Sequence, residues 1–318
     1  MDEKDARTWI VVGIDGSPQA RNALRWSVWL APLLDAQIAV VHGTGLLDHL
    51  DDEGGELAPA HEHLAAIRAT VERDWCGVGI PGRPVHVDVR ERPAVDAVLA
   101  AAEERDASLV VLGTRGAGIA PAQALGSTAL QVLRRLAGRS RPALVVPDPA
   151  DCPSVEVRRL VVGVDGSTAS LSALAWAADL AALTGASCEV VATIEDAPWV
   201  PLGPSAAVTA EGETDAPRRL RRLARDWCQP LRAAELQHRV TIVRGAPAPT
   251  LVRVARMLAA DLLVVGSSGA GASGNPLLGS VSRRVAHDAG RPVAVVPAGA
   301  RLIRPARVPA GVADTARW

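Results

Sequence analysis

The chain has 318 residues, and at about 150 residues per domain this length suggests two domains. Its formal net charge of −1 leaves no basic excess, so we expect neither nucleic acid nor an anionic membrane as a partner. Hydrophobic residues make up 48% and charged residues 22%, an ordinary globular composition with no apolar run long enough to span a membrane.

Short apolar runs alternate with amphipathic stretches along the chain. In the first half we expect strands at 9–14, 37–43, 85–89, 108–113 and 142–147, and helices near 18–34, 58–76, 93–105 and 127–137. In the second half we expect strands near 158–164, 187–193, 239–244, 261–266 and 292–297, and helices near 168–184, 214–235, 248–260 and 280–289. Such regular β-α alternation with aliphatic strands predicts a doubly wound, parallel α/β sheet.

The second half repeats the first. IVVGIDGS at 10–17 recurs as LVVGVDGS at 160–167, and LVVLGTRGAG at 109–118 recurs as LLVVGSSGAG at 262–271. Trp26 recurs as Trp176, and both are expected in the core. The repeat predicts two homologous domains and a tail, which we expect to be disordered, with these bounds: 1–149, 150–299 and 300–318.

A glycine frame follows the fourth strand of each half. Both copies read G-x2-G-x9-G-S, formed by Gly113, Gly116, Gly126 and Ser127 in the first half and by Gly266, Gly269, Gly279 and Ser280 in the second. Glycines permit close approach and positive φ, and the free N–H groups of a helix start attract an anion. Alternatively, the glycines only form turns and the serines only cap helices, because a duplication copies turns as well as sites.

An aspartate ends the first strand of each half, as Asp15 and Asp165 within Asp-Gly-Ser. In a doubly wound sheet, ligands bind at the carboxyl edge where the strand order reverses. If strands one and four are neighbours, each aspartate faces its glycine frame across one crevice, where it can accept hydrogen bonds from ribose hydroxyls or an adenine amine. A helix cap is the alternative role, although Ser17 or Ser167 can supply the cap.

These motifs, with the strand endings RPALVVP at 141–147 and RPVAVVP at 291–297, resemble the universal stress protein family in its tandem form, from about residue 8 to residue 298. The resemblance implies two five-stranded sheets of strand order 3-2-1-4-5, an adenine nucleotide alpha hydrolase-like fold, and ATP with magnesium held through its phosphates. It also implies that the two halves pair through strands 142–147 and 292–297. A homodimer of two chains is a further expectation.

The resemblance assigns roles to the candidate residues. Asp15 and Asp165 would lie at the adenosine, backbone near Gly43 and Thr193 would read the adenine edge, and the frame glycines and serines would hold ribose and phosphates. One feature departs from the family: the loops 117–125 and 270–278 carry no basic residue. Arg115 is the nearest cation in the first half, and Ser268 takes its place in the second.

We therefore expect an ATP-binding stress-response or regulatory protein with one nucleotide site per domain and no catalytic residues. The alternatives are a slow ATP-hydrolysing or ATP-consuming enzyme of this fold, and a structural dimerisation module. We interpret His61-Glu62-His63 as a solvated segment rather than a metal site, and His42 as a core histidine near the crevice.

The N-terminal stretch MDEKDART carries charges of both signs, which is not typical of a signal peptide. The cysteines lie far apart and form no C-x-x-C pair: Cys76, Cys152, Cys188 and Cys228. We expect a cytoplasmic protein with free thiols.

Overall fold

The computed structural model describes residues 8–45, 85–116, 125–148, 155–194, 225–269 and 278–302, with Ala65, Ala69 and Ala150. The strands of the first half are β1 (Trp9–Gly13), β2 (Gln37–Gly43), β3 (Val85–Arg90), β4 (Leu109–Gly113) and β5 (Ala143–Val146). Those of the second half are β6 (Arg159–Val164), β7 (Ser187–Ile194), β8 (His238–Arg244), β9 (Leu262–Gly266) and β10 (Val293–Val296).

The described helices of the first half are α1 (Pro18–Leu34), α3 (Ala94–Glu104) and α4 (Ser127–Leu136). Those of the second half are α5 (Thr168–Thr184), α7 (Gln229–Ala233), α8 (Pro247–Met257) and α9 (Ser280–Asp288). Of the helix predicted near 58–76 the structure describes Ala65 and Ala69, both helical. The first part of the helix predicted near 214–235 lies outside the described residues.

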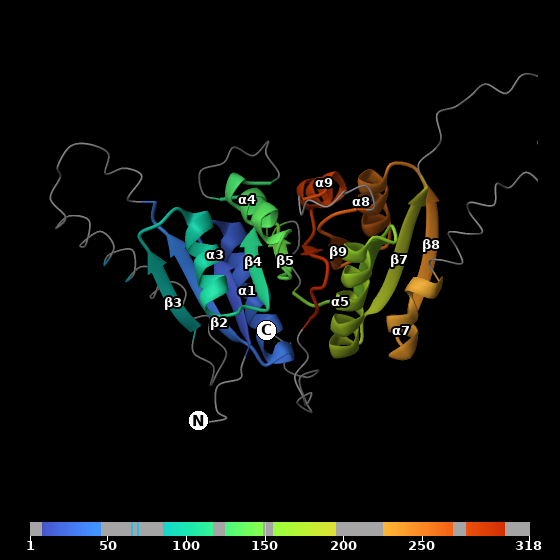
Figure 1. Ribbon diagram of the computed structural model, residues 1–318, viewed down its shortest axis with the longest axis horizontal. Helices are drawn as coiled ribbons and strands as arrows, with labels where there is room; N and C mark the ends of the chain where they lie inside the picture. Colours follow the sequence, from blue (N-terminus) through green and yellow to red (C-terminus); the bar gives the residue numbers. More distant parts are fainter. Residues whose placement is uncertain are drawn as a thin grey trace, which may run out of the picture.

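All ten strands form one sheet, in the order β3-β2-β1-β4-β5-β10-β9-β6-β7-β8. Each half has the predicted order 3-2-1-4-5 with parallel neighbours, which confirms the doubly wound α/β fold. The halves meet where β5 and β10 pair antiparallel, with Leu144 opposite Ala294 (Figure 1). Because strand direction reverses at this pair, the carboxyl edges of the two halves lie at opposite edges of the common sheet.

Two apolar layers cover the sheet. Alternate residues of β1 point to opposite faces: Ile10 and Val12 pack in a core with α1 and α5, whereas Val11 packs in a second core with α3, α4, α8 and α9. Trp26 and Trp176 are fully buried in the first of these cores, as predicted. Both cores include residues from the two halves, so the halves share their packing.

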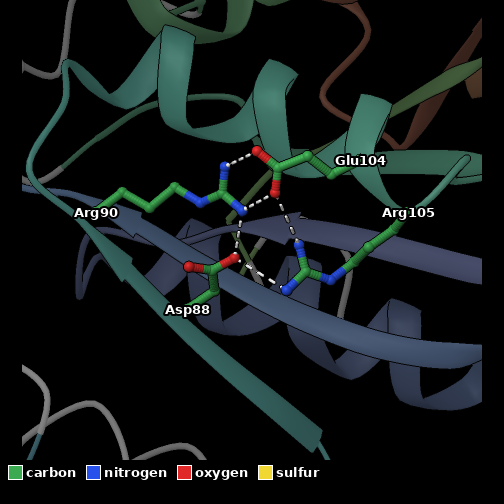
Figure 2. A network of polar contacts seen from close by, with 4 residues as sticks. All are labelled: Asp88, Arg90, Glu104 and Arg105. Atoms are coloured by element: carbon green, nitrogen blue, oxygen red, sulfur yellow. Dashed lines mark hydrogen bonds and ion pairs between the residues drawn. The ribbon is translucent and has the colours of Figure 1, made fainter.

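The edge strand β3 is fastened to the end of α3 by an ionic network (Figure 2). Arg90 Nη2 lies 2.6 Å from both Asp88 Oδ2 and Glu104 Oε2, and Arg105 Nη2 lies 3.0 Å from Asp88 Oδ2. The Arg105 guanidinium also lies 5.5 Å from the ring centre of Trp9, within the range of a cation–π contact. Charged side chains on an edge strand also discourage pairing with other chains.

The ordered chain continues past residue 299. Ala300 and Leu302 are buried in the core that contains α1 and α5. Gly299 N donates to Ser172 Oγ at 3.0 Å, and Ser140 Oγ donates to Ala298 O at 3.4 Å, so this segment contacts both halves. The expectation of a disordered tail was therefore wrong for 300–302, because an alternating apolar pair packs there, and 303–318 lies outside the described residues.

Candidate functional site

The turn after the first strand has the same geometry in both halves. Asp15 Oδ1 accepts a hydrogen bond from Ser17 N at 3.0 Å, and Asp165 Oδ1 accepts one from Ser167 N at 2.9 Å. The residue between them is a glycine with φ of 84° in the first half and 82° in the second, a conformation that side chains rarely adopt. Each turn thus fixes one carboxylate oxygen and leaves the other directed elsewhere.

The serine of each turn caps the following helix and also holds the glycine frame. Ser17 Oγ accepts from Ala20 N at 3.1 Å and donates to Arg115 O at 3.4 Å. Ser167 Oγ accepts from Ser170 N at 3.2 Å and donates to Ser268 O at 3.3 Å. The serine therefore supplies the cap that was an alternative role for the aspartate.

The second carboxylate oxygen faces the second glycine of the frame. A Cβ on Gly116 would lie 2.4 Å from Asp15 Oδ2, and a Cβ on Gly269 would lie 2.9 Å from Asp165 Oδ2. Strands one and four are neighbours in both halves, so each aspartate meets its frame as expected. A side chain at either glycine would displace the carboxylate from its present position.

The first glycine of the frame packs against a helix. A Cβ on Gly113 would lie 2.8 Å from Gln19 Cβ and 2.9 Å from Gln19 C, and a Cβ on Gly266 would lie 2.7 Å from both Ala169 C and Ser170 N. No glycine of the frame is among those with positive φ. At Gly113 and Gly266, therefore, glycine is needed for the close approach to the helix and not for a left-handed backbone.

The third glycine, not the serine, caps the next helix. Gly126 and Gly279 are the N-cap residues of α4 and α9, and no side chain caps either helix. Ser127 and Ser280 are the first helical residues, so the alternative in which these serines only cap the helices does not hold. Gly126 N donates to Thr114 O at 2.6 Å and Gly279 N donates to Ser267 O at 2.7 Å, which brings each helix start to the end of its fourth strand.

The first crevice is a cavity of about 90 Å³ at the carboxyl edge of β1 and β4. Its lining includes every first-half candidate except Ser127, namely Asp15, Gly43, Gly113, Gly116 and Gly126. Sequence reasoning missed the apolar wall at the start of α3, where Ala94 and Val98 lie. The chain order could have suggested that wall, because a helix that follows the edge strand β3 packs over the adjacent strands β2 and β1.

The second crevice is the equivalent cavity at β6 and β9, with a volume of about 540 Å³. All the second-half candidates line it, namely Asp165, Thr193, Gly266, Gly269, Gly279 and Ser280. Pro247 and Leu251 of α8 form the wall that sequence reasoning missed. The same parts of the fold thus build both crevices, but the volume of the second is about six times that of the first.

Titratable groups are sparse around both crevices. His42 is half-buried rather than part of the core, and its Nδ1 lies 2.9 Å from the carbonyl oxygen of Ile14, a residue that lines the first crevice. The described residues contain no group of three or more histidine, cysteine, aspartate or glutamate side chains that could hold a metal ion. The segment His61-Glu62-His63 lies outside the described residues, so its interpretation stays a prediction.

The two described cysteines, Cys188 and Cys228, are free and buried. Burial raises the pKa of the Cys188 thiol to about 12, and nearby Cys228 adds to the shift. Burial also raises the pKa of Cys228. Both thiols stay protonated at neutral pH, which makes them poor nucleophiles. Among the described residues, no helix is long and apolar enough to cross a membrane.

The universal stress protein family model matches residues 7–146 and 156–297. A universal stress protein of Mycolicibacterium smegmatis is 32% identical over 299 residues, covering 90% of this chain and 96% of that protein. One of Mycobacterium tuberculosis is 29% identical over 313 residues, covering 93% and 98%. The crystal structure of a universal stress protein from Archaeoglobus fulgidus, 19% identical, superposes with a TM-score of 0.61 and covers 92% of this chain and 98% of that one.

The repeated sheet, with an aspartate and a glycine frame at each carboxyl edge, defines a tandem doubly wound α/β protein. The two family matches span most of the chain, and the chain therefore belongs to the universal stress protein family, in its tandem form. This confirms the resemblance seen in the sequence. The likeness to the Archaeoglobus structure independently supports the fold.

Proposed function

We propose that this chain is a nucleotide-binding regulatory member of its family that binds ATP, with one candidate site at the carboxyl edge of each half. The observation that carries the proposal is the meeting of an aspartate and a glycine frame at one crevice in both halves. Each crevice lies between β1 and β4 or their equivalents, where the strand order reverses and doubly wound sheets bind their ligands.

The residues present suit an adenine nucleotide. Asp15 and Asp165 offer carboxylate oxygens to ribose hydroxyls or an adenine amine, and aliphatic walls such as Val41 and Val191 can cover a base. The first N–H groups of α4 and α9 have no partner within their helices and favour phosphate. Magnesium would be held through the phosphates, because the described residues offer no metal cluster.

The same residues favour binding over catalysis. Fast phosphoryl transfer needs cations on the developing charge and a group that positions the attacking water. Arg115 is the one cation among the described residues that line either crevice, and the lining includes no histidine or lysine. We expect hydrolysis on the order of 10⁻³ per second or slower, the scale of an unassisted GTPase. Single-turnover release of phosphate from bound ATP measures this rate.

Equilibrium binding of ATP with magnesium to the full chain tests the proposal. The double variant Asp15→Asn, Asp165→Asn should lose binding while keeping its thermal unfolding midpoint. Asp106→Asn is the matched control, because Asp106 is exposed and lines neither crevice. Mass spectrometry of small molecules released from the purified protein identifies any nucleotide carried from the cell. Wild-type chain that binds neither ATP nor ADP at millimolar ligand would refute the proposal.

A further inference from the structure

We propose that the two crevices are unequal: the second is the high-affinity nucleotide site and fills first, and the first must open before it admits a whole nucleotide. This inference rests on the proposed function and concerns the order in which its sites are used. It predicts a chain with one occupied half over a wide range of nucleotide concentration.

Volume is the first observation. Cavities that hold small organic ligands and cofactors typically measure about 300–1,000 Å³. The second crevice, at about 540 Å³, lies within that range, and the first, at about 90 Å³, lies well below it. The first crevice therefore has room for part of a nucleotide only.

A structural difference between the two crevices lies at the end of the second strand. A Cβ on Gly43 would lie 2.6 Å from Ala94 Cα and 2.7 Å from Arg92 O, so the end of β2 touches the backbone at the start of α3. Thr44 N donates to Arg90 O at 3.0 Å and Gly45 N donates to Arg92 O at 3.1 Å, which holds this closed contact. The glycine thus acts as the point of closure.

The second half has Thr193 at the place of Gly43. The two residues occupy the same register, since Gly43 pairs with Arg90 of β3 and Thr193 pairs with Val243 of β8. Thr193 lines the second crevice together with Pro247, the first residue of α8. A side chain therefore fits between strand and helix in the second half, where the first half has no room for a methyl group.

The lining residues differ as well. Five residues with hydroxyl groups line the second crevice, namely Ser170, Thr193, Ser268, Ser280 and Ser282, but Ser170 Oγ donates to Ser167 O and Ser282 Oγ donates to Ser267 O. At the places of these two serines the first crevice has Ala20 and Ala129, and its own hydroxyl side chains are Thr114 and Thr128. The hydroxyl that the second crevice gains at the end of its second strand is that of Thr193, which can donate to phosphate or accept from ribose.

Arg115 acts in the opposite direction, because it gives the first crevice a cation where the second has Ser268. A guanidinium strengthens the binding of phosphate groups. It creates no space for the base, however, and the contact at Gly43 still has to open. The fraction of open molecules scales the apparent affinity, so an open state populated at about 10% or less weakens binding at least tenfold.

Titration calorimetry of the full chain with ATP and magnesium tests the order. We expect two phases, with one equivalent bound first and the second equivalent bound at least about tenfold more weakly. Asp165→Asn should remove the first phase, and its counterpart Asp15→Asn should leave that phase unchanged. Thr193→Trp, which fills the second crevice from a partly exposed position, should also remove the first phase while the unfolding midpoint is kept.

Equal affinity of the two halves, with Asp15→Asn and Asp165→Asn each removing one of two identical sites, would overturn the inequality and leave the proposed function standing. Loss of the tighter phase in Asp15→Asn would overturn it as well, because the order would be reversed. Absence of binding in the wild-type chain would instead refute the proposed function itself.

Discussion

The two halves agree where the fourth strand meets the first helix and differ at the third strand and the end of the helix that follows it. In the first half the last residue of α3 is Glu104 and its C-cap is Arg105, both members of the ionic network on β3. In the second half α8 ends in Met257, which is 75% exposed, with Leu258 as its C-cap. Asp88 and Arg90, the other two members, give way to Thr241 and Val243 at the same register.

This difference separates two kinds of constraint. The network can be replaced because it fastens one edge strand, and the second half holds its edge strand β8 without it. The glycines at 113 and 266 have the same packing in both halves, because a helix backbone lies under 3 Å from the position of a Cβ. The repeat therefore keeps the contact between the fourth strand and the first helix and varies the third strand and its partners, and the following changes test that distinction.

Gly113→Ala and Gly266→Ala should give the largest effects, of similar size in the two halves. The new methyl group would overlap Gln19 in one half and Ala169 with Ser170 in the other, and α1 or α5 would have to shift. Such overpacking costs about 1–3 kcal/mol of unfolding free energy. Urea denaturation measures it. We expect one cooperative transition, because the apolar cores extend across both halves.

Gly279→Ala is the matched control, since its nearest contact from a Cβ is 3.3 Å, to Ser267 O. It should cost clearly less than Gly266→Ala. Equal losses at Gly266 and Gly279, or two separate unfolding transitions, would contradict the packing described for the frame and the shared cores.

Ser17→Ala and Ser167→Ala should have the next largest effect, again equal in the two halves. Each change removes a helix cap and a hydrogen bond to the loop after the fourth strand. The expected loss is about 1–2 kcal/mol. Ser17→Thr and Ser167→Thr should restore most of it, because threonine keeps the hydroxyl. A loss confined to one half would show that the turns are not equivalent.

Much of this arrangement could be predicted from the sequence. The aliphatic strands, the α/β order and the repeat predicted the sheet, and nearly all candidate residues line the two crevices. The roles of the glycines and serines were predicted less well, because the sequence of a Gly-Ser pair does not show which of the two residues is the N-cap of the helix. The unequal volumes could not be predicted, since the sequence does not give the separation between a strand end and the helix packed against it.

Asp88→Thr, which installs the second-half residue, should have a smaller effect that depends on pH. Burial by itself raises the pKa of Asp88, but hydrogen bonds and charge from Arg90 and Arg105 outweigh it and lower the pKa overall. A carboxyl with a lowered pKa stabilises the fold above its unfolded value of about 3.9, and this contribution is lost as the pH falls through the folded value.

The expected loss for Asp88→Thr at pH 7 is therefore about 1 kcal/mol or less, since such pairs are partly solvated. The difference from wild type should shrink as the pH falls below about 4. Urea denaturation of the variant and of the wild type at several pH values measures it. A difference that stays constant from pH 7 to pH 3 would show that Asp88 contributes packing rather than charge.

Met257→Glu, which installs the first-half residue at the end of α8, should have the smallest effect. The side chain is mostly exposed, and Val243 and Leu258 stand where the first half has the arginines that bind Glu104. A lone surface glutamate without those partners should change the unfolding free energy by no more than about 0.5 kcal/mol. The reverse change, Glu104→Met, should cost more than Met257→Glu, because it removes two contacts of Arg90 at 2.9 Å and 2.6 Å. Thermal unfolding of the two variants side by side measures the contrast. If both changes cost the same, the network on β3 gives the first half no stability that the second half lacks, and the surface difference between the halves would carry no energetic weight.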